Sequence, residues 1–347
     1  MKFPIRSTAL LALTGLAIGL SLSAPAVARP DPAAKKVAIL IFDAVEVIDY
    51  SGPLEVFADA GFDVFTVAAS KDPVTTSAGD AVKLTPKYSF TDAPQADLIV
   101  IPGGGFEAAK DSATVAWIKR ESEHAAHTMS VCNGAFTLAN TGLLDGLKAT
   151  TTAGNINRLR QSYPAITVTP DRRIVDNGKI LTTAGLSAGI DGALHMVDVM
   201  KGAGAGQSVA LAIEYDWRPN GSYVRGAMAD RMIPSIDRAL YALKIGNAVD
   251  STMKGDNNSW DATLWYSTKQ VPAEFLALMK TTFEKAYALD GGPWAPKSFR
   301  MESAGPLAAK LQFDDREGHH WKGLLTVAPV EGEAQQLAFR FAIDRVS

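Results

Sequence analysis

Cysteine is almost absent from this chain: Cys132 is the only one among 347 residues. A single cysteine excludes an internal disulfide, so the fold must depend on its hydrophobic core even in an oxidising compartment. The length is sufficient for such a core and predicts one medium-sized domain with a smaller one.

An excess of either charge is also lacking. The chain has 34 Lys and Arg against 37 Asp and Glu, a net charge of -3, with the two signs interspersed. This balance excludes the electrostatic footprint of proteins that bind nucleic acid or anionic lipid. No basic helix-turn-helix pattern is present in the C-terminal residues, which argues against direct transcriptional control. We therefore expect a small molecule as the partner.

A long apolar run occurs at the N-terminus. Lys2 and Arg6 precede the apolar stretch 9–20, and Ala26 and Ala28 form a small-residue cleavage pattern. These features predict a signal peptide over residues 1–28 and an exported protein, periplasmic or secreted. The apolar core is too short for a comfortable membrane span, so we expect no stable membrane insertion. A retained N-terminal anchor is the alternative.

Strand-like and helix-like segments alternate over the first two thirds of the chain. Continuously apolar runs at 36–42, 62–68 and 96–101 are typical of strands covered on both faces, and helices are expected at 52–60 and 115–125. This alternation predicts an α/β fold with a mostly parallel sheet between helices. Its ligand crevice is expected at the carboxyl ends of the strands.

The pattern changes toward the C-terminus. After an Asn-Gly hairpin at 173–181 and helices at 187–200 and 208–215, polar loop-like segments follow. An amphipathic helix is expected at 272–289, and alternation of period two then predicts antiparallel strands packed on it. The predicted organisation is a main domain over 33–220, a linker with helices over 221–270, and a smaller α+β domain over 271–347.

Cys132 lies in the sequence Ser-Val-Cys-Asn-Gly, residues 130–134, between an apolar run and a helix-like run. Such a pattern at a strand-to-helix junction predicts a tight, strained turn that exposes the central side chain above the sheet. The amino-terminal end of the following helix would favour the thiolate, the reactive form. The alternative is a small buried hydrophobic residue, since free cysteines are among the most buried residue types. We expect a nucleophile.

Together, these motifs resemble the DJ-1/PfpI (ThiJ/PfpI) superfamily, on the branch of bacterial isonitrile hydratases and of the class I glutamine amidotransferase-like sensor domains of some transcription regulators. They occur in the family's order over about residues 35–217, which is far more specific than any one motif. No resemblance covers residues 235–347. The matching segments are 42–43, 48–57, 97–104, 130–134, 142–146, 150–152, 183–191 and 193–195.

The resemblance implies a flavodoxin-like three-layer sandwich, usually a homodimer, with Cys132 as the nucleophile. It also places Asp49 where relatives have an acidic residue that faces the nucleophile. A carboxyl within hydrogen-bond reach of the sulfur can relay a proton or hold a water, provided that partial burial raises its pKa. The alternative for Asp49 is a helix amino-terminal cap, since it comes just before the expected helix at 52–60.

The glycine turn at 103–105 is implied by the family to bring a backbone amide toward the reacting atom. The amides of Gly104 or Gly105 and of Asn133 would then form an anion hole. A glycine triplet alone is more often only a tight turn. The remaining expected pocket residues are Gly52, Gly103 and Gly134.

Two departures from the family pattern bear on the substrate. Asn133 stands where the hydratase branch commonly has Thr, and Ala153 and Gly154 stand where many relatives have a His. A cysteine peptidase or an amidotransferase needs an imidazole to move the proton. His124 and His127 are expected at the surface and His195 in the packing of a helix, so none of these replaces it.

No cofactor and no metal site are expected. The chain has no full phosphate-binding fingerprint. His319 and His320 lie near Asp314 and Asp315, but neighbours in a strand point to opposite faces and make poor joint ligands.

The sequence leaves two functions open. The first is a cysteine-dependent enzyme acting on a small electrophile, of the isonitrile hydratase type, a carbon-nitrogen lyase that forms an N-substituted formamide. The second is a noncatalytic redox or ligand sensor with a reactive cysteine. Another activity of the superfamily, on an alpha-oxoaldehyde or an amide, is a third possibility that the missing His disfavours.

Overall fold

The computed structural model describes residues 34–233, 246–289, 296–315 and 317–346. The predicted signal peptide, 1–28, lies outside these residues. Among the helices that the structure describes, none combines the length and the hydropathy needed to cross a membrane.

A seven-stranded sheet forms the centre of the N-terminal part, with the strand order β10-β11-β7-β6-β1-β2-β5. All neighbouring pairs are parallel except β10 and β11, which form the hairpin predicted around Asn177 and Gly178. The strands are β1 (Lys36–Leu40), β2 (Asp63–Ala68), β5 (Tyr88–Ser89), β6 (Leu98–Ile101), β7 (His127–Ser130), β10 (Ile174–Asp176) and β11 (Ile180–Thr183). Two small sheets accompany it: β3 (Val74–Thr76) with β4 (Gly79–Leu84), and β8 (Lys148–Ala149) with β9 (Thr167–Val168).

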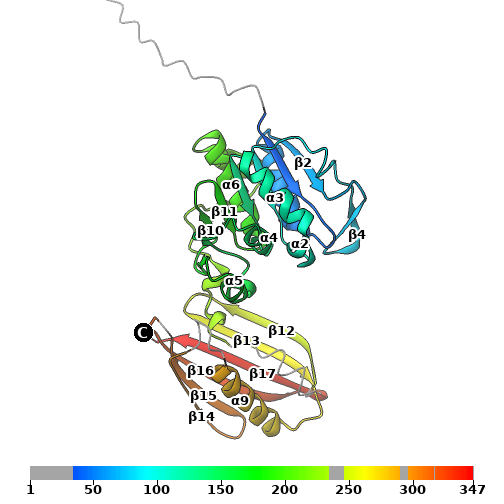
Figure 1. Ribbon diagram of the computed structural model, residues 1–347. Helices are drawn as coiled ribbons and strands as arrows, with labels where there is room; N and C mark the ends of the chain where they lie inside the picture. The colour runs from blue at the N-terminus through cyan, green and yellow to red at the C-terminus, as the bar shows by residue number, and fades with distance from the viewer. Residues whose placement is uncertain (1–33, 234–245, 290–295, 316, 347) are drawn as a thin grey trace, which may run out of the picture. The chain divides into compact units, whose positions relative to one another are not determined.

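Helices cover both faces of this sheet (Figure 1). The apolar residues of β1 show why: Val37 and Ile39 face one core cluster, whereas Ala38 and Leu40 face the other. One face carries α1 (Val47–Asp59), α6 (Ser187–Lys201) and α7 (Ala205–Ala212). The other carries α2 (Glu107–Lys110), α3 (Ser112–His124), α4 (Gly134–Asn140) and α5 (Ile156–Ser162). The predicted flavodoxin-like α/β sandwich with a mostly parallel sheet is confirmed.

The C-terminal part contains a separate six-stranded antiparallel sheet with the order β12-β13-β17-β16-β15-β14. Helix α9 (Pro272–Leu289) lies against one face of it (Figure 1), where its apolar side chains join the core cluster of the sheet. This helix and the antiparallel strands after it were predicted. The strands are β12 (Asn247–Gly255), β13 (Ser259–Ser267), β14 (Ser298–Ser303), β15 (Ala308–Asp314), β16 (His320–Val330) and β17 (Glu333–Arg345).

Two sequence-based expectations about the elements were wrong. The first helix begins at Val47 rather than at residue 52, so Pro53 lies inside the helix instead of in its first turn. Segment 221–270, expected as a linker with helices, contains β12 and β13 as well as the short 3-10 helices η2 (Arg225–Ala227) and η3 (Ala229–Met232). Every residue of β12 is exposed, so its sequence has none of the apolar alternation that predicts a strand.

Candidate active site

Cys132 lies between β7 and α4 with a φ of 58°. This left-handed conformation is energetically unfavourable for any residue other than glycine. Its neighbours hold it there. The backbone N–H of Cys132 donates to Ala184 O at 3.1 Å, just after β11, and Thr151 Oγ1 donates to Cys132 O at 2.7 Å. The strained turn predicted at the strand-to-helix junction is therefore present, but the side chain of Cys132 is partly buried rather than exposed above the sheet.

Two glycines allow the backbone to approach this turn closely. A Cβ atom on Gly134 would lie 2.2 Å from Ile101 O. A Cβ atom on Gly103 would lie 2.7 Å from Asp49 Oδ2 and 2.8 Å from Cys132 Cβ. Both positions therefore exclude any larger residue, and Gly103 packs directly on the carboxyl and the cysteine. Gly52, also expected in the pocket, instead lies in α1 at its contact with Ile190 of α6.

Asp49 is placed in the first turn of α1 and is fully buried. It does not cap its own helix. Its Oδ2 accepts from the N–H of Gly103 at 3.0 Å, its Oδ1 accepts from the N–H of Leu186 at 3.1 Å, and the carboxyl is also hydrogen-bonded to the Cys132 thiol. The alternative interpretation as a helix cap is thus wrong, and the carboxyl faces the sulfur.

Burial raises the pKa of Asp49 to about 6. The hydrogen bonds from Gly103, Leu186 and the thiol act in the opposite direction, and the nearby negative charge of Glu46 adds to the rise. A carboxyl with this pKa is largely ionised at neutral pH and can still be protonated close to it. That is the property required of a group that accepts and returns a proton.

The pKa of Cys132 is raised to about 12, first by burial and then by the charge and the hydrogen bond of Asp49. Hydrogen bonds from the Asn133 amide and the Thr152 hydroxyl lower it. The expectation that helix α4 would favour the thiolate is wrong, because burial and the carboxylate outweigh the end of a seven-residue helix. At neutral pH, the resting pair is a thiol that donates to a carboxylate.

The glycine turn is closely engaged with its surroundings. The N–H of Gly104 donates to Asn133 Oδ1 at 2.7 Å, and the N–H of Gly105 donates to Ala44 O at 2.9 Å. In this structure, neither amide hydrogen is directed to the sulfur. The amide of Asn133, in contrast, does donate to Cys132. An anion hole that includes Gly104 or Gly105 stays a prediction and would require the turn to rearrange.

Two further residues contact the pair and had no role assigned from the sequence. Thr152 donates its hydroxyl to the sulfur. Leu186, which precedes α6, has a φ of 57° and donates its N–H to Asp49 from 137 positions along the chain. Both lie in segments that match the family pattern, and this match was the only feature of the sequence that could have pointed to them as site residues.

All five histidines are among the described residues, and none of them bonds to Cys132 or Asp49. His127 Nδ1 lies 3.0 Å from Gly178 O, and His195 Nε2 lies 2.8 Å from Asp176 Oδ2. His319 and His320 lie in the C-terminal part. The expectation that no imidazole serves Cys132 agrees with these contacts.

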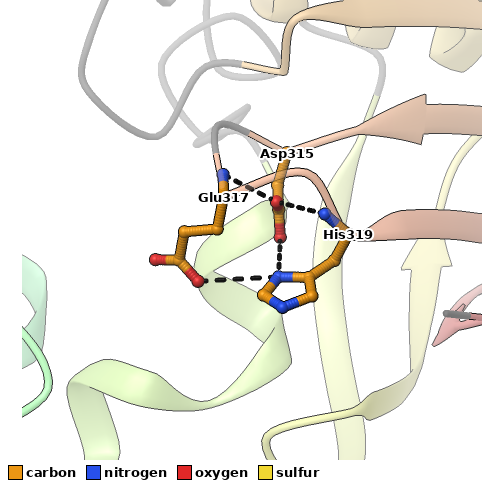
Figure 2. Close-up of side chains that lie close together, drawn as sticks. All are labelled: Asp315, Glu317 and His319. Atoms are coloured by element: carbon orange, nitrogen blue, oxygen red, sulfur yellow. Dashed lines mark hydrogen bonds and ion pairs between the residues drawn. The ribbon is translucent and has the colours of Figure 1, made fainter.

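A group of side chains in the turn between β15 and β16 was considered for metal binding from the sequence. His319 and His320 do separate, because His320 Nδ1 bonds Asp314 Oδ1 at 2.7 Å whereas His319 faces Asp315 and Glu317 (Figure 2). Oxygen or nitrogen atoms of Asp315, Glu317 and His319 all lie within 4.8 Å of one another.

The buried Asp315 carboxylate holds this turn together. Its Oδ1 accepts from the N–H groups of Glu317 and His319, each at 2.9 Å, as Figure 2 shows. Its Oδ2 accepts from His319 Nδ1 and from Trp321 Nε1, each at 3.0 Å. Glu317 Oε2 also lies 3.7 Å from the Arg231 guanidinium. The four hydrogen bonds that Asp315 accepts explain its burial: the carboxylate fixes the conformation of the turn.

The chain is similar to several known proteins. An isonitrile hydratase of Pseudomonas putida is 34% identical over 187 residues, which are 52% of this chain and 79% of the relative. A deglycase of Thermococcus kodakarensis is 28% identical over 119 residues, 34% of this chain and 72% of the relative. A solved ThiJ/PfpI family protein from Pseudomonas syringae is 29% identical and covers 58% of this chain and 86% of its own, with a TM-score of 0.49.

The family match extends over residues 35–199, which include the cysteine turn, the buried carboxyl and the start of α6. The similarity to the isonitrile hydratase covers most of that relative's length. This chain belongs to the DJ-1/PfpI family.

Proposed function

We propose that this protein is an isonitrile hydratase-like enzyme, in which Cys132 is the nucleophile and Asp49 the proton acceptor and donor. The observation that carries the proposal is the buried Asp49 carboxyl hydrogen-bonded to the only thiol, with a pKa of about 6. The similarity to an isonitrile hydratase supports this choice of substrate.

The reaction follows from the pair. Asp49 accepts the thiol proton as the sulfur of Cys132 bonds to the terminal carbon of the isonitrile, and then returns that proton to the same carbon, which gives a thioimidate. Asp49 next takes a proton from water as the water oxygen adds to the thioimidate carbon. Asp49 passes this water proton to nitrogen. The carbon–sulfur bond then breaks as the hydroxyl becomes the formamide carbonyl, and the second water proton passes through Asp49 to the sulfur and restores the thiol. The net change is addition of one water to give an N-substituted formamide.

The environment of the thiol disfavours other reactions. A peptidase or an amidotransferase needs a group that protonates a departing amine, and an imidazole usually does this. Four histidines bond other groups: His127, His195, His319 and His320. An isonitrile has no leaving group, so a single carboxyl suffices. Attack on an alpha-oxoaldehyde stays the nearest alternative within the family.

The noncatalytic redox sensor is less well supported. Oxidation of a cysteine proceeds through the thiolate, and sensor cysteines have a low pKa and are accessible. Burial and the adjacent carboxylate raise the pKa of Cys132 instead. This favours a thiol that is activated only when Asp49 takes its proton.

Turnover of a panel of alkyl and aryl isonitriles by the purified protein tests the proposal. We expect formamide from the wild type, none from Cys132→Ala, and a loss of about 100-fold or more in Asp49→Asn. Rapid acid quench followed by mass spectrometry should find one isonitrile mass added at Cys132. His195→Gln is the matched control and should keep wild-type turnover, since its ring bonds Asp176. An inactive wild type would refute the substrate assignment.

We also propose that the protein is exported after cleavage behind Ala28 and forms a homodimer, as the leader sequence and the family resemblance suggest. Expression with its leader in a Gram-negative host, followed by fractionation and N-terminal sequencing, tests the first. Light scattering of the mature protein tests the second. Retention in the cytoplasm with an uncut leader, or a monomer at micromolar concentration, would contradict them.

A further inference from the structure

The amide that Leu186 donates to Asp49 comes from a strained position. Leu186 has a φ of 57° and a ψ of -115° and no side-chain cap forms at the start of α6. In this conformation its N–H donates to Asp49 Oδ1 at 3.1 Å. A residue with a side chain keeps such a conformation when neighbouring contacts overdetermine it. The contacts that hold the first turn of α6 are therefore part of the site.

Arg173 supplies those contacts. Its guanidinium spans the turn: Nη2 donates to Ser187 Oγ at 2.9 Å, and Nε donates to Asp191 Oδ2 one helical turn later. Tyr215 OH donates to the other oxygen of Asp191 at 2.8 Å. Both ionic side chains are largely shielded from solvent, 21% and 13% exposed. A planar guanidinium holding two acceptors in fixed directions is well suited to fixing a short stretch of backbone.

The backbone of Arg173 reaches the cysteine on the other side. Its carbonyl accepts from the N–H of Ala184 at 2.9 Å, and the carbonyl of Ala184 accepts from the N–H of Cys132 at 3.1 Å. One residue therefore connects, by hydrogen bonds, to both strained positions of the site, Cys132 and Leu186.

We propose that Arg173 is a positioning residue: by bonding Ser187 and Asp191 it fixes the first turn of α6 so that the Leu186 N–H stays on the Asp49 carboxylate. This inference rests on the proposed function of the Cys132 and Asp49 pair. Loss of the Arg173 contacts lets Leu186 relax, and the carboxylate loses one of its two amide donors. The carboxyl then holds its proton to higher pH, because hydrogen bonds to the charged form are what lower its pKa.

The charged and titratable groups around the two sites are few. Cys132 and Glu46 influence the Asp49 carboxyl. Asp191, Tyr215 and the ring of Tyr223, 5.7 Å from the guanidinium carbon, face Arg173. A change at Arg173 can therefore act on Asp49 through geometry or through its charge, and the test must separate the two.

The test is the pH dependence of alkylation of the only thiol by iodoacetamide, measured by mass spectrometry from pH 4.5 to 9. It needs no substrate. In the wild type, the rate should rise with a midpoint near pH 6 as Asp49 becomes able to accept the thiol proton. Arg173→Lys, which keeps the charge, and Ser187→Ala, which keeps every charge, should each move this midpoint up by about half to one pH unit.

Arg218→Lys is the matched control, since Arg218 pairs with the exposed Asp216. Its midpoint should equal that of the wild type. Circular dichroism identifies any variant that fails to fold, and Ser187→Ala, the mildest change, then decides. If the midpoint is unchanged in both Arg173→Lys and Ser187→Ala, the positioning role is overturned. The same conclusion follows if only Arg173→Gln, which removes the charge, shifts the midpoint. A wild type with no midpoint near pH 6 overturns the proposed role of Asp49 instead.

Discussion

The side-chain amide of Asn133 holds the Gly104 peptide from both sides: Nδ2 donates to Gly104 O at 2.7 Å, and Oδ1 accepts from Gly104 N at 2.7 Å. This pairing joins the residue after Cys132 to the glycine turn that packs on Asp49. Only an amide side chain offers a donor and an acceptor in this arrangement. Asn133 therefore fixes the turn as well as donating its backbone N–H to the sulfur.

Replacing Asn133 by Asp should break half of that pairing. The new carboxylate still accepts from Gly104 N but faces Gly104 O without a hydrogen, and it adds a negative charge beside Asp49 and Cys132. We expect a loss of about 1–3 kcal/mol in the free energy of unfolding, measured by urea titration. Alkylation of Cys132 at pH 8 should also slow, because a second negative charge raises the pKa of the thiol further. Asn140→Asp, a substitution of the same kind at the other end of α4, should leave the alkylation rate unchanged.

Replacing Asp49 by Asn should make the thiol more acidic while it removes the proton acceptor. The carboxylate contributes to raising the pKa of Cys132 to about 12, and burial contributes the rest. The variant's thiol pKa should therefore fall below 12 but stay above the ordinary value. At pH 10 its alkylation by iodoacetamide should be faster than in the wild type, by about tenfold for each unit of the fall.

The same Asp49→Asn protein should have lost the alkylation midpoint near pH 6, since no carboxyl remains to titrate there. Asp176→Asn, which changes a carboxyl bonded to His195 instead, should keep the wild-type profile. Slower alkylation of Asp49→Asn at pH 10 would mean that the carboxylate does not raise the thiol pKa, contrary to the contacts described above.

The central sheet was predictable because its strands are continuously apolar, and Val37 to Leu40 show the reason: successive residues enter opposite cores. Cys132 was predictable because a glycine two positions later permits the close approach to Ile101. The Leu186 contact was not, because nothing local marks a leucine for positive φ when its partner is 137 positions away. The exposed residues of β12 likewise contain no periodic signal, since its apolar residues Ala248, Val249 and Met253 do not alternate with polar ones.

The thiol pKa shows a different limit of sequence analysis. A helix amino terminus after Cys132 was visible in the sequence, and by itself it favours the thiolate. The degree of burial and the placement of the Asp49 charge depend on tertiary packing, and both act more strongly in the other direction. Short-range motifs thus predicted the strained turn at Cys132 but gave the wrong protonation state for its thiol.

The turn at Asp315 should be a stabilising element of the C-terminal part. Burial acts to raise the pKa of Asp315, but the hydrogen bonds from Trp321 and His319 outweigh it and the pKa is lowered. A carboxyl whose folded pKa lies below its unfolded value of about 3.9 stabilises the fold above that pH, and the contribution is lost as the pH falls through the folded pKa. Asp315→Asn replaces one of the two carboxylate oxygens, each shared by two donors, with an NH2 group and removes the charge, and should cost about 2–4 kcal/mol at pH 7.

Urea unfolding followed by intrinsic fluorescence measures this loss; Trp321, whose Nε1 donates to Asp315, is one of the six tryptophans that contribute to the signal. The difference between the wild type and Asp315→Asn should be constant from pH 8 to pH 5 and shrink at lower pH, since only the wild type then loses a charged acceptor. Asp314→Asn is the matched control: its carboxyl bonds His320 at the surface, where solvent screens the pair, and its loss should cost much less than that of Asp315. Equal losses in the two variants would show that burial and the four donors add nothing to the role of Asp315.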